Sequence, residues 1–399
     1  MNMFSDAMPG PAQEPQRSIM LLVNYLGVGG AEIQVVRLAV GLRRRGWRVS
    51  VVSMLGPGIL AGQLHEQEIP VHGLNMRPGV PNPLGVMRLR RIIRKEQPDI
   101  VHSHIVHANI LARVTRLVTH MRVLVCTAHN MQEGGRAYDL SYRYTDSLAD
   151  LTTNVSQAAV DRYVQIKAAP VDRIRFVPNG LDISRYRKSP ADRDRLRGEL
   201  NVQNQFVWLA AGRFHLQKDY PNMFRAFAAA TVADNQASTI TGPTRASEAM
   251  LLLAGTGPLE ADLRQLAATL GVDDRVRFLG IRSDMPELMN AADCFVLSSA
   301  WEGMPLVLQE ASASELPIVA TRVGGNAEVV LDGSSGFLVP PGDENALAAA
   351  MKKMMALPEP QRDAIGRAGR EYIVNRFDME NVLGEWEGIY EELLLAHPR

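Results

Sequence analysis

The chain has 399 residues, of which 46% are apolar, and its 43 basic residues balance 43 acidic ones. This length predicts two or three domains, and the composition predicts a soluble globular protein. The zero net charge argues against a nucleic-acid-binding protein held by long-range attraction. The chain opens with a polar, proline-rich stretch, residues 1–17, which lacks the apolar core of a signal peptide and predicts a disordered leader.

Strands and helices alternate from Ile19 to Asp182, which predicts an open parallel sheet with helices on both faces. The charge-dense, turn-prone segment that follows, residues 185–198, is placed at the domain boundary. The expected strands of this half are Ile19–Val23, Trp47–Met54, Pro98–His104 and Val123–Ala128, and the expected helices are Ile33–Arg45, Leu84–Lys95, Asn109–Thr119, Tyr138–Ala149 and a helix ending at Ile166.

A second α/β series begins at Phe206, so the two halves look like copies of one architecture. We therefore expect domains at 18–184 and 185–376, followed by a separate C-terminal helix within 377–399. The expected strands are Phe206–Gly212, Met250–Ala254, Val276–Leu279, Ala292–Leu297 and Ile318–Thr321, the helices Pro221–Val232, Leu259–Leu270, Ala346–Leu357, Glu359–Val374 and Met379–Leu395, and the loose loop Asn235–Ser247.

Two carboxylates flank a predicted helix start in Ser298–Glu310, where Glu302 and Glu310 lie on either side of a Gly-Met-Pro turn. Pro305 suits the first turn of a helix, because its missing N–H is not needed there. The free N–H groups of a helix start bind anions, and carboxylates bind hydroxyls. The pattern therefore suits a sugar joined to a phosphate.

Two cations, Arg213 and Lys218, follow a strand end in the segment Gly212–Tyr220. Arginine and lysine together commonly bind phosphate at this edge of a parallel sheet, although a solvated basic loop would look the same. Gly27-Val-Gly-Gly30 lacks the third glycine of a dinucleotide fingerprint. It remains either a junction where a phosphate approaches the backbone or a structural turn.

Several polar residues allow more than one interpretation. His129 ends a strand and could be catalytic or simply structural. The spacing of His102, His104 and His107 does not favour a shared metal site, and no metal is expected. Asp192-Arg-Asp194 is interpreted as solvated surface. The basic helix at 84–95 is either a charged outer face or a contact with an anionic membrane surface. No apolar run reaches the roughly 18 residues of a membrane span, which predicts a cytoplasmic protein.

The motifs together resemble glycosyltransferase family 4. Their order carries the resemblance, which covers the chain from about residue 18 to the last helix. The motifs are Gly29-Gly-Ala-Glu32, Pro178-Asn-Gly-Leu-Asp182, Gly-Arg-Phe-x3-Lys218-Asp-Tyr-Pro, Gly255-Thr-Gly-Pro, the pair Glu302-x7-Glu310 and Thr321-x2-Gly-Gly-x2-Glu328. The resemblance implies the GT-B fold, in which two Rossmann-like domains face a cleft and the last helix crosses back to the first domain. It also implies a retaining, metal-independent transferase that uses nucleotide-sugar donors and no cofactor.

The resemblance also implies roles for individual residues. Arg213 and Lys218 would neutralise the donor diphosphate, Glu302 would bind hydroxyls of the transferred sugar, and Glu310 would bind the ribose. The remaining implied positions are the backbone N–H groups of Leu306 and Val307 at the diphosphate, Gly29 and Gly30 facing it from the first domain, His129 near the sugar, Ile281 and Arg282 beside the base, and Glu328 near the cleft without an assigned role.

The expected function is transfer of a sugar from a nucleotide-sugar, with UDP-sugars favoured and GDP-sugars open, to a glycan or lipid-linked glycan in cell-surface polysaccharide synthesis. Two alternatives remain on the same fold. One is a nucleotide-sugar 2-epimerase, and the other is a non-catalytic subunit that binds the donor. The localisation expected with this function is cytoplasmic, with contact to the inner face of the membrane through 84–95 as a hypothesis.

Overall fold

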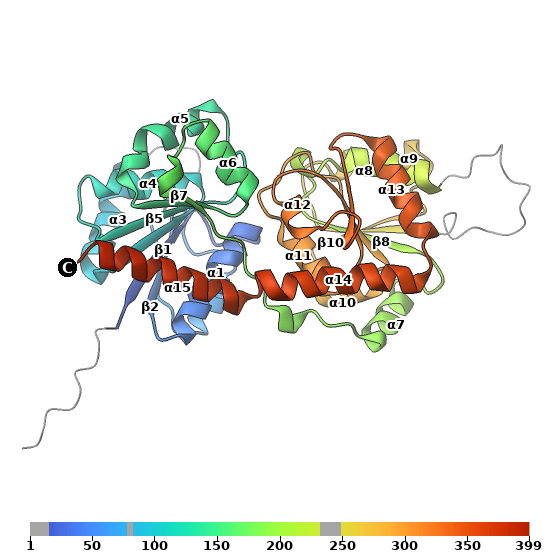
Figure 1. The fold of residues 1–399 in the computed structure, drawn as a ribbon, viewed down its shortest axis with the longest axis horizontal. Coiled ribbons are helices and arrows are strands. Elements are labelled where there is room, and N and C mark those ends of the chain that lie inside the picture. The colour runs from blue at the N-terminus through green and yellow to red at the C-terminus, as the bar shows by residue number, and fades with distance from the viewer. Residues whose placement is uncertain (1–15, 78–82, 232–248, 399) are drawn as a thin grey trace, which may run out of the picture. The chain divides into compact units, whose positions relative to one another are not determined.

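Two parallel β-sheets with helices on their faces make up the protein, as the computed structural model shows (Figure 1). The structure describes residues 16–77, 83–231 and 249–398. The predicted α/β class with two Rossmann-like sheets is therefore confirmed. The loop expected at Asn235–Ser247 and nearly all of the expected leader lie outside the described residues.

The first sheet has the strand order β3-β2-β1-β4-β5-β6-β7. The chain builds outward from β1 to β3 and then returns to β4 on the other side of β1, which creates a topological switch point between β1 and β4. Their pairing is parallel, from Ile19↔Ile100 to Leu22↔Ser103. The strands are β1 (Ser18–Val23), β2 (Arg48–Ser53), β3 (Val71–Gly73), β4 (Ile100–His104), β5 (Val123–Ala128), β6 (Leu151–Asn154) and β7 (Ile174–Phe176).

Helices connect these strands, as parallel pairing requires. The helices are α1 (Gly30–Arg44), α2 (Ala61–His65), α3 (Pro83–Glu96), α4 (Val106–Arg116), α5 (Arg136–Thr145) and α6 (Gln157–Gln165). The strands β1 and β5 are buried along their whole length, and apart from Ser18 and Thr127 their residues are apolar.

The second sheet repeats the same plan in the order β10-β9-β8-β11-β12-β13, and all of its pairs are parallel. Its switch point lies between β8 and β11. The strands are β8 (Val207–Ala211), β9 (Met250–Ala254), β10 (Val276–Gly280), β11 (Cys294–Leu297), β12 (Ile318–Thr321) and β13 (Gly336–Val339). The helices are α8 (Tyr220–Thr231), α9 (Glu260–Thr269), α10 (Met285–Ala291), α11 (Leu306–Ala313), α12 (Asn326–Val329), α13 (Glu344–Ala356) and α14 (Glu359–Phe377).

The segment interpreted as a turn-prone linker contains a helix instead. Residues 190–199 form α7 (Pro190–Glu199), whose N-terminus is capped by the Ser189 hydroxyl, which accepts from the Asp192 N–H at 3.2 Å. Proline at the first helical position favours this start. Only Leu196 and Arg197 of α7 are buried, so the apolar periodicity that identifies most helices is missing from its sequence.

The described chain forms two compact units. One comprises the chain up to Cys126 together with Ser147–Asp150 and the C-terminal segment from Gly388, and the other comprises Thr127–Asp146 and Leu151–Glu387. This division runs through the first sheet, so the domain boundary near residue 184 stays a prediction.

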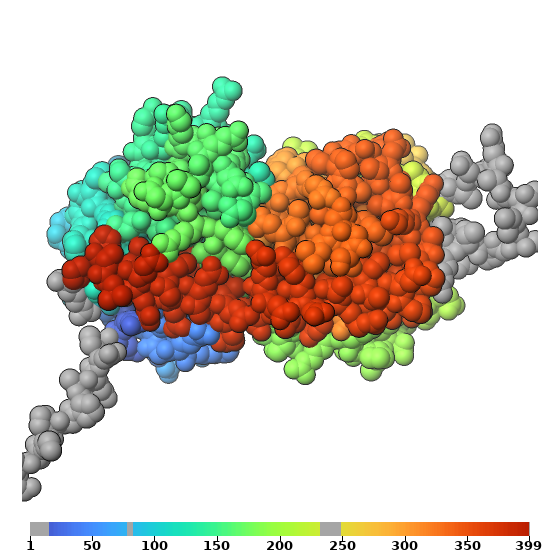
Figure 2. Space-filling model, in the orientation of Figure 1, coloured from blue at the N-terminus to red at the C-terminus, as the bar shows by residue number. Residues whose placement is uncertain are grey.

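The last helix, α15 (Met379–Ala396), contributes its second half to the first unit. There the buried Tyr390 hydroxyl lies 2.7 Å from His102 Nδ1, and the Tyr390 ring packs edge-on against Trp47 at 5.6 Å. The preceding helix α14 exposes one side to solvent (Figure 2). Within the described residues, no helix is long and apolar enough to cross a membrane.

Candidate functional site

Two loops meet at the switch point of the second sheet. Strands β8 and β11 pair directly, with Cys294 opposite Trp208 and Phe295 opposite Leu209. The loops that follow their carboxyl ends are residues 212–219, here called the β8 loop, and residues 298–305, here called the β11 loop. In open α/β sheets, ligands bind outside the carboxyl ends of the strands at such a point. The predicted residues Arg213, Lys218 and Glu302 lie on these two loops.

Hydrogen bonds tie the two loops together. The Ser298 hydroxyl donates to the carbonyl oxygens of Lys218 and Asp219 at 2.8 and 2.9 Å, and the Ala300 N–H donates to the Gln217 carbonyl at 2.8 Å. Asp219 adopts a left-handed conformation with φ 45°, which ends the short 3₁₀ helix at Leu216–Lys218. The backbone on which Lys218 stands is therefore fixed against the β11 loop.

A buried ion pair joins Lys218 to Glu302. The Lys218 Nζ lies 2.6 Å from Glu302 Oε1, and the two side chains are only 15% and 6% exposed. The Ser299 hydroxyl donates to the same oxygen at 2.7 Å, and the Gln217 amide donates to Glu302 Oε2 at 3.2 Å. Burial and then the charge of Glu302 raise the pKa of nearby Tyr220, so this phenol stays neutral. The structure thus brings together two of the predicted catalytic residues and leaves Arg213 exposed on the β8 loop.

Helix α11 begins directly after the β11 loop. Pro305 is its N-cap rather than a residue of its first turn, and no side chain caps the helix. The N–H groups of Leu306 and Val307 belong to the first turn, where an α-helix has no intrahelical acceptor for its N–H groups. Glu310 lies in the second turn and is buried.

Two glycines allow close packing around the β11 loop. Gly324 has φ +47°, and a Cβ on this residue would overlap the carbonyl oxygen of Glu302. A Cβ on Gly303 would overlap the carbonyl oxygen of His129. Only glycine fits at either position, so the Gly324-Gly325 motif supports the Glu302 loop, and His129 lies directly beside that loop.

The surroundings of His129 keep its ring neutral. Burial lowers the pKa of His129 to about 4, so the imidazole carries no charge at neutral pH. Its backbone N–H donates to Glu133 Oε1 at 2.7 Å, and the buried Tyr142 hydroxyl donates to Glu133 Oε2 at 2.7 Å. A neutral imidazole can donate or accept a hydrogen bond but cannot neutralise a diphosphate.

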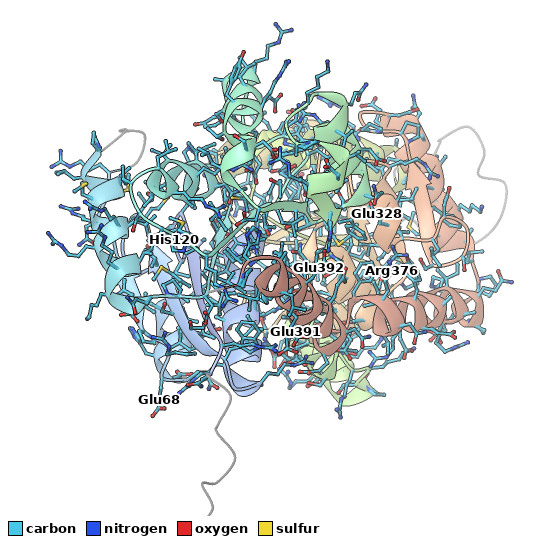
Figure 3. All side chains as sticks on the ribbon, turned by 60° about the vertical axis from the view of Figure 1, so that its left-hand side comes forward. Glu68, His120, Glu328, Arg376, Glu391 and Glu392 are labelled. Carbon is cyan, nitrogen blue, oxygen red and sulfur yellow. The ribbon has the colours of Figure 1, made fainter. Side chains whose placement is uncertain are left out.

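Glu328, whose role the sequence leaves open, accepts hydrogen bonds from the N-terminus of α6. Its carboxylate accepts the N–H groups of Gln157 and Ala158 at 3.0 and 3.1 Å, at the first two positions of α6. Figure 3 labels this residue beside α6. A carboxylate is favourable there because the N-terminus of a helix carries partial positive charge.

Gly29 and Gly30 belong to the first unit. Gly29 is the N-cap of α1, and the Glu32 carboxylate folds back over it, so a Cβ on Gly29 would overlap a Glu32 oxygen. Burial raises the pKa of Glu32. The Glu32 carboxylate therefore lies against Gly29.

Ile281 and Arg282, the two residues predicted beside the base, differ in their surroundings. Ile281 is 72% exposed, and the Arg282 guanidinium binds Asp284, with Nε 2.7 Å from Oδ1. Among the described residues, no group of three or more histidine, cysteine or acidic side chains could hold a metal ion. The sequence analysis did not identify Gln217 or Ser299 as site residues. The only available signal was that Gln217 directly precedes Lys218 and that Ser299 lies three residues before Glu302.

Comparison with known sequences and structures supports the same interpretation. The family described as Glycosyltransferase Family 4 matches residues 28–185, and that described as Glycosyl transferases group 1 matches residues 192–372. The UDP-Gal:alpha-D-GlcNAc-diphosphoundecaprenol alpha-1,3-galactosyltransferase of Escherichia coli is 26% identical over 319 residues, which cover 78% of this chain and 79% of that protein. The D-inositol 3-phosphate glycosyltransferase of Nocardia farcinica is 30% identical over 375 residues, which cover 86% and 79%.

A solved structure shows the same fold. The crystal structure of Anabaena HepE in complex with UDP superposes with a TM-score of 0.80 at 25% identity, and the match covers 94% of this chain and all of that one. HepE has also been solved with UDP-glucose, with a TM-score of 0.79 at 25% identity. The two family matches, the Nocardia relative and the shared GT-B architecture lead to one conclusion: the chain belongs to glycosyltransferase family 4.

Proposed function

We propose that this protein transfers a sugar from a UDP-sugar to a glycan or lipid-linked glycan acceptor, with retention of the anomeric configuration. The observation that carries the proposal is the switch point of the second sheet. There an exposed Arg213, an ammonium at Lys218 and the uncapped start of α11 all follow the β8 and β11 strand ends. The UDP-bound HepE structure and the galactosyltransferase that acts on a diphosphoundecaprenol-linked sugar support this donor and acceptor class.

The positive groups explain how the leaving group departs. As the bond between the anomeric carbon and the diphosphate oxygen breaks, negative charge grows on the diphosphate. Fixed donors aimed at this charge stabilise the transition state without reorganisation. Arg213 and Lys218 supply two positive charges, and Leu306 and Val307 supply N–H groups. We propose that these groups provide the charge stabilisation that a metal ion gives in other transferases.

The carboxylates are assigned to hydroxyl binding rather than to nucleophilic attack. Glu302 is already bound by Lys218, Ser299 and Gln217, so it is poorly suited to form a covalent intermediate. We therefore propose front-face transfer. The acceptor oxygen bonds to the anomeric carbon on the side from which the diphosphate leaves, and the departing phosphate oxygen takes the acceptor proton. Glu302 then binds the transferred sugar and Glu310 the ribose.

The remaining proposed contacts follow from the resemblance. Ile281 and Arg282 would flank the base, and the exposed face of Ile281 suits a planar ring. Gly29 and Gly30 would approach the diphosphate once the Glu32 carboxylate moves aside. His129, neutral and beside the Glu302 loop, would contact the sugar. We propose a domain boundary between residues 184 and 185, with the donor-binding domain C-terminal to it.

A nucleotide-sugar panel tests the proposal. Thermal shift against UDP-, GDP- and ADP-sugars should single out a UDP-sugar, because a ligand that binds only the folded state at 100 times its Kd stabilises by about 2.7 kcal/mol. The selected donor is then incubated with lipid-linked acceptors, and NMR of the product reports the anomeric configuration. An inverted product would contradict the mechanism. Donor sugar epimerised without any acceptor would indicate the epimerase instead.

A contact with the membrane is proposed through α3. Leu84 and Met87 are 59% and 51% exposed, and the later turns of the same helix carry Arg91, Arg94 and Lys95 at exposed positions. Exposed apolar side chains beside a basic cluster favour an anionic lipid surface. Flotation with vesicles of phosphatidylcholine, with and without phosphatidylglycerol, tests this. Binding that does not depend on the anionic lipid would refute it.

A further inference from the structure

The Glu302 carboxylate is held by three donors from two different loops. Lys218 Nζ and Ser299 Oγ both bind Oε1, at 2.6 and 2.7 Å, whereas Gln217 Nε2 binds Oε2 at 3.2 Å. An ionised carboxylate offers about four acceptor positions. Three are therefore occupied, and the position that remains lies on Oε2, the oxygen that Gln217 contacts.

Gln217 is the group that fixes the orientation of this last acceptor position. Lys218 and Ser299 anchor Oε1 alone, so concerted changes of the Glu302 side-chain torsions, of which the terminal one is broad, can still swing Oε2 about the anchored oxygen. The Gln217 amide, as a donor to Oε2, restrains this movement. Gln217 is itself anchored, because its carbonyl oxygen accepts the Ala300 N–H at 2.8 Å. The backbone of Gln217, on the β8 loop, is therefore fixed against the β11 loop, and its amide acts from this fixed position.

Burial makes this orientation consequential. Glu302 is 5% exposed and Ser299 is fully buried, so little water competes for the carboxylate. A site built to bond one substrate hydroxyl strongly disfavours a substrate that presents no hydroxyl in that direction, because its own polar group is then left unpaired. The direction of the free Oε2 position thus distinguishes sugars that differ in the orientation of a single hydroxyl.

We propose that Gln217 is a specificity-determining positioning residue. By fixing the plane of the Glu302 carboxylate, it selects the configuration of the hydroxyl that the transferred sugar presents to Oε2. This inference rests on the proposed function, in which Glu302 faces the transferred sugar. It predicts that Gln217 affects discrimination between epimeric donors without affecting the binding of the nucleotide.

The test uses Gln217→Met, which keeps the length of the side chain and removes the amide. The donor selected by the panel is compared with its C4 epimer, as UDP-glucose against UDP-galactose or as the corresponding N-acetylated pair. We expect the ratio of kcat/KM for the preferred donor to kcat/KM for its epimer to fall about tenfold in the variant, toward a value of one. A tenfold change corresponds to the free energy of about one hydrogen bond. The Kd of UDP, measured by calorimetry, should stay within about twofold of the wild type, because Gln217 does not reach the nucleotide in this assignment.

Two further variants distinguish a positioning role of Gln217 from a general loss of activity. Ser299→Ala removes a donor from Oε1 and leaves the Gln217 contact, so it should lower kcat for both epimers by similar factors and preserve their ratio. Gln265→Met, at an exposed position of α9, should change nothing. An unchanged epimer ratio in Gln217→Met, or an equal loss of UDP affinity, would overturn the inference, as would a wild-type enzyme that uses both epimers equally. A wild type that binds no UDP would instead overturn the proposed function itself.

Discussion

Breaking the Lys218–Glu302 pair from one side should destabilise the protein far more than replacing both partners. At 2.6 Å and an effective dielectric constant of about 20, two unit charges attract by about 6 kcal/mol. Desolvation of two ions that are 15% and 6% exposed offsets most of this attraction. Lys218→Met, however, leaves the Glu302 charge buried without its counter-ion, and such changes typically cost about 3–5 kcal/mol. Lys218→Met/Glu302→Gln should lie much closer to the wild type.

Thermal denaturation of the wild type, the two single variants and the double variant measures this difference. For a domain of about 200 residues, 1 kcal/mol shifts Tm by about 2–4 °C, so Lys218→Met should melt about 10 °C lower. Lys353→Met, on a lysine that lies over the Phe337 ring and far along the sequence from both loops, serves as the control. If both single variants melted within about 2 °C of the wild type, which is under 1 kcal/mol, the ion pair would not form in solution.

For three other substitutions, the structure fixes the direction of the change in stability or in amide exchange. His129 has a pKa near 6.5 in the unfolded chain and about 4 in the folded chain, so the free energy of unfolding falls as the pH drops between these values. His129→Asn should therefore remove about 2 kcal/mol of the stability that the wild type loses between pH 7.5 and 5. Denaturant titrations at both pH values measure this loss, and an equal loss in the variant and the wild type would contradict the prediction. Tyr390→Phe should cost about 1 kcal/mol by chemical denaturation, because the buried His102 ring loses its bond to the hydroxyl, and no change would show that bond to be unimportant. Glu328→Gln keeps one acceptor oxygen for α6 but loses its charge, so amide exchange in that helix should speed up severalfold, whereas exchange in α9 should not.

The strands that the sequence predicts are the ones made of apolar runs. Ile19–Val23 and Met250–Ala254 are buried throughout, and their composition shows it. Strand β6, Leu151-Thr-Thr-Asn154, was missed as a strand because three of its four residues are polar, although all four are buried. The Thr153 hydroxyl meets the Thr127 hydroxyl at 2.6 Å, so its polarity is satisfied inside the sheet. A pattern based on hydrophobicity alone cannot detect such a strand.

The site could be predicted in its parts but not in its connections. Arg213, Lys218 and Glu302 stand out because each follows an apolar strand. That Lys218 would pair with Glu302, 84 positions away, depends on β8 and β11 being neighbours across the switch point, which is a property of the strand order. Ile105 shows another limit, because its backbone has φ 73°, which a β-branched residue rarely adopts. Nothing in the local sequence marks this conformation at the corresponding switch point of the first sheet.

In the proposed function, the Lys218–Glu302 ion pair links recognition of the sugar to recognition of the diphosphate. Lysine has three N–H donors, and Glu302 takes one of those on Lys218, so the same group can also contact a phosphate oxygen. In the proposed site, the carboxylate assigned to the sugar therefore also orients the cation assigned to the diphosphate. Because hydrogen bonds hold the two loops together, little reorganisation remains to be done in the transition state, which is the condition under which fixed charges accelerate a reaction most. Loss of Lys218 should accordingly reduce kcat more than it weakens UDP binding, since in the proposed site Arg213 and the start of α11 would still hold the nucleotide while the sugar would lose its alignment.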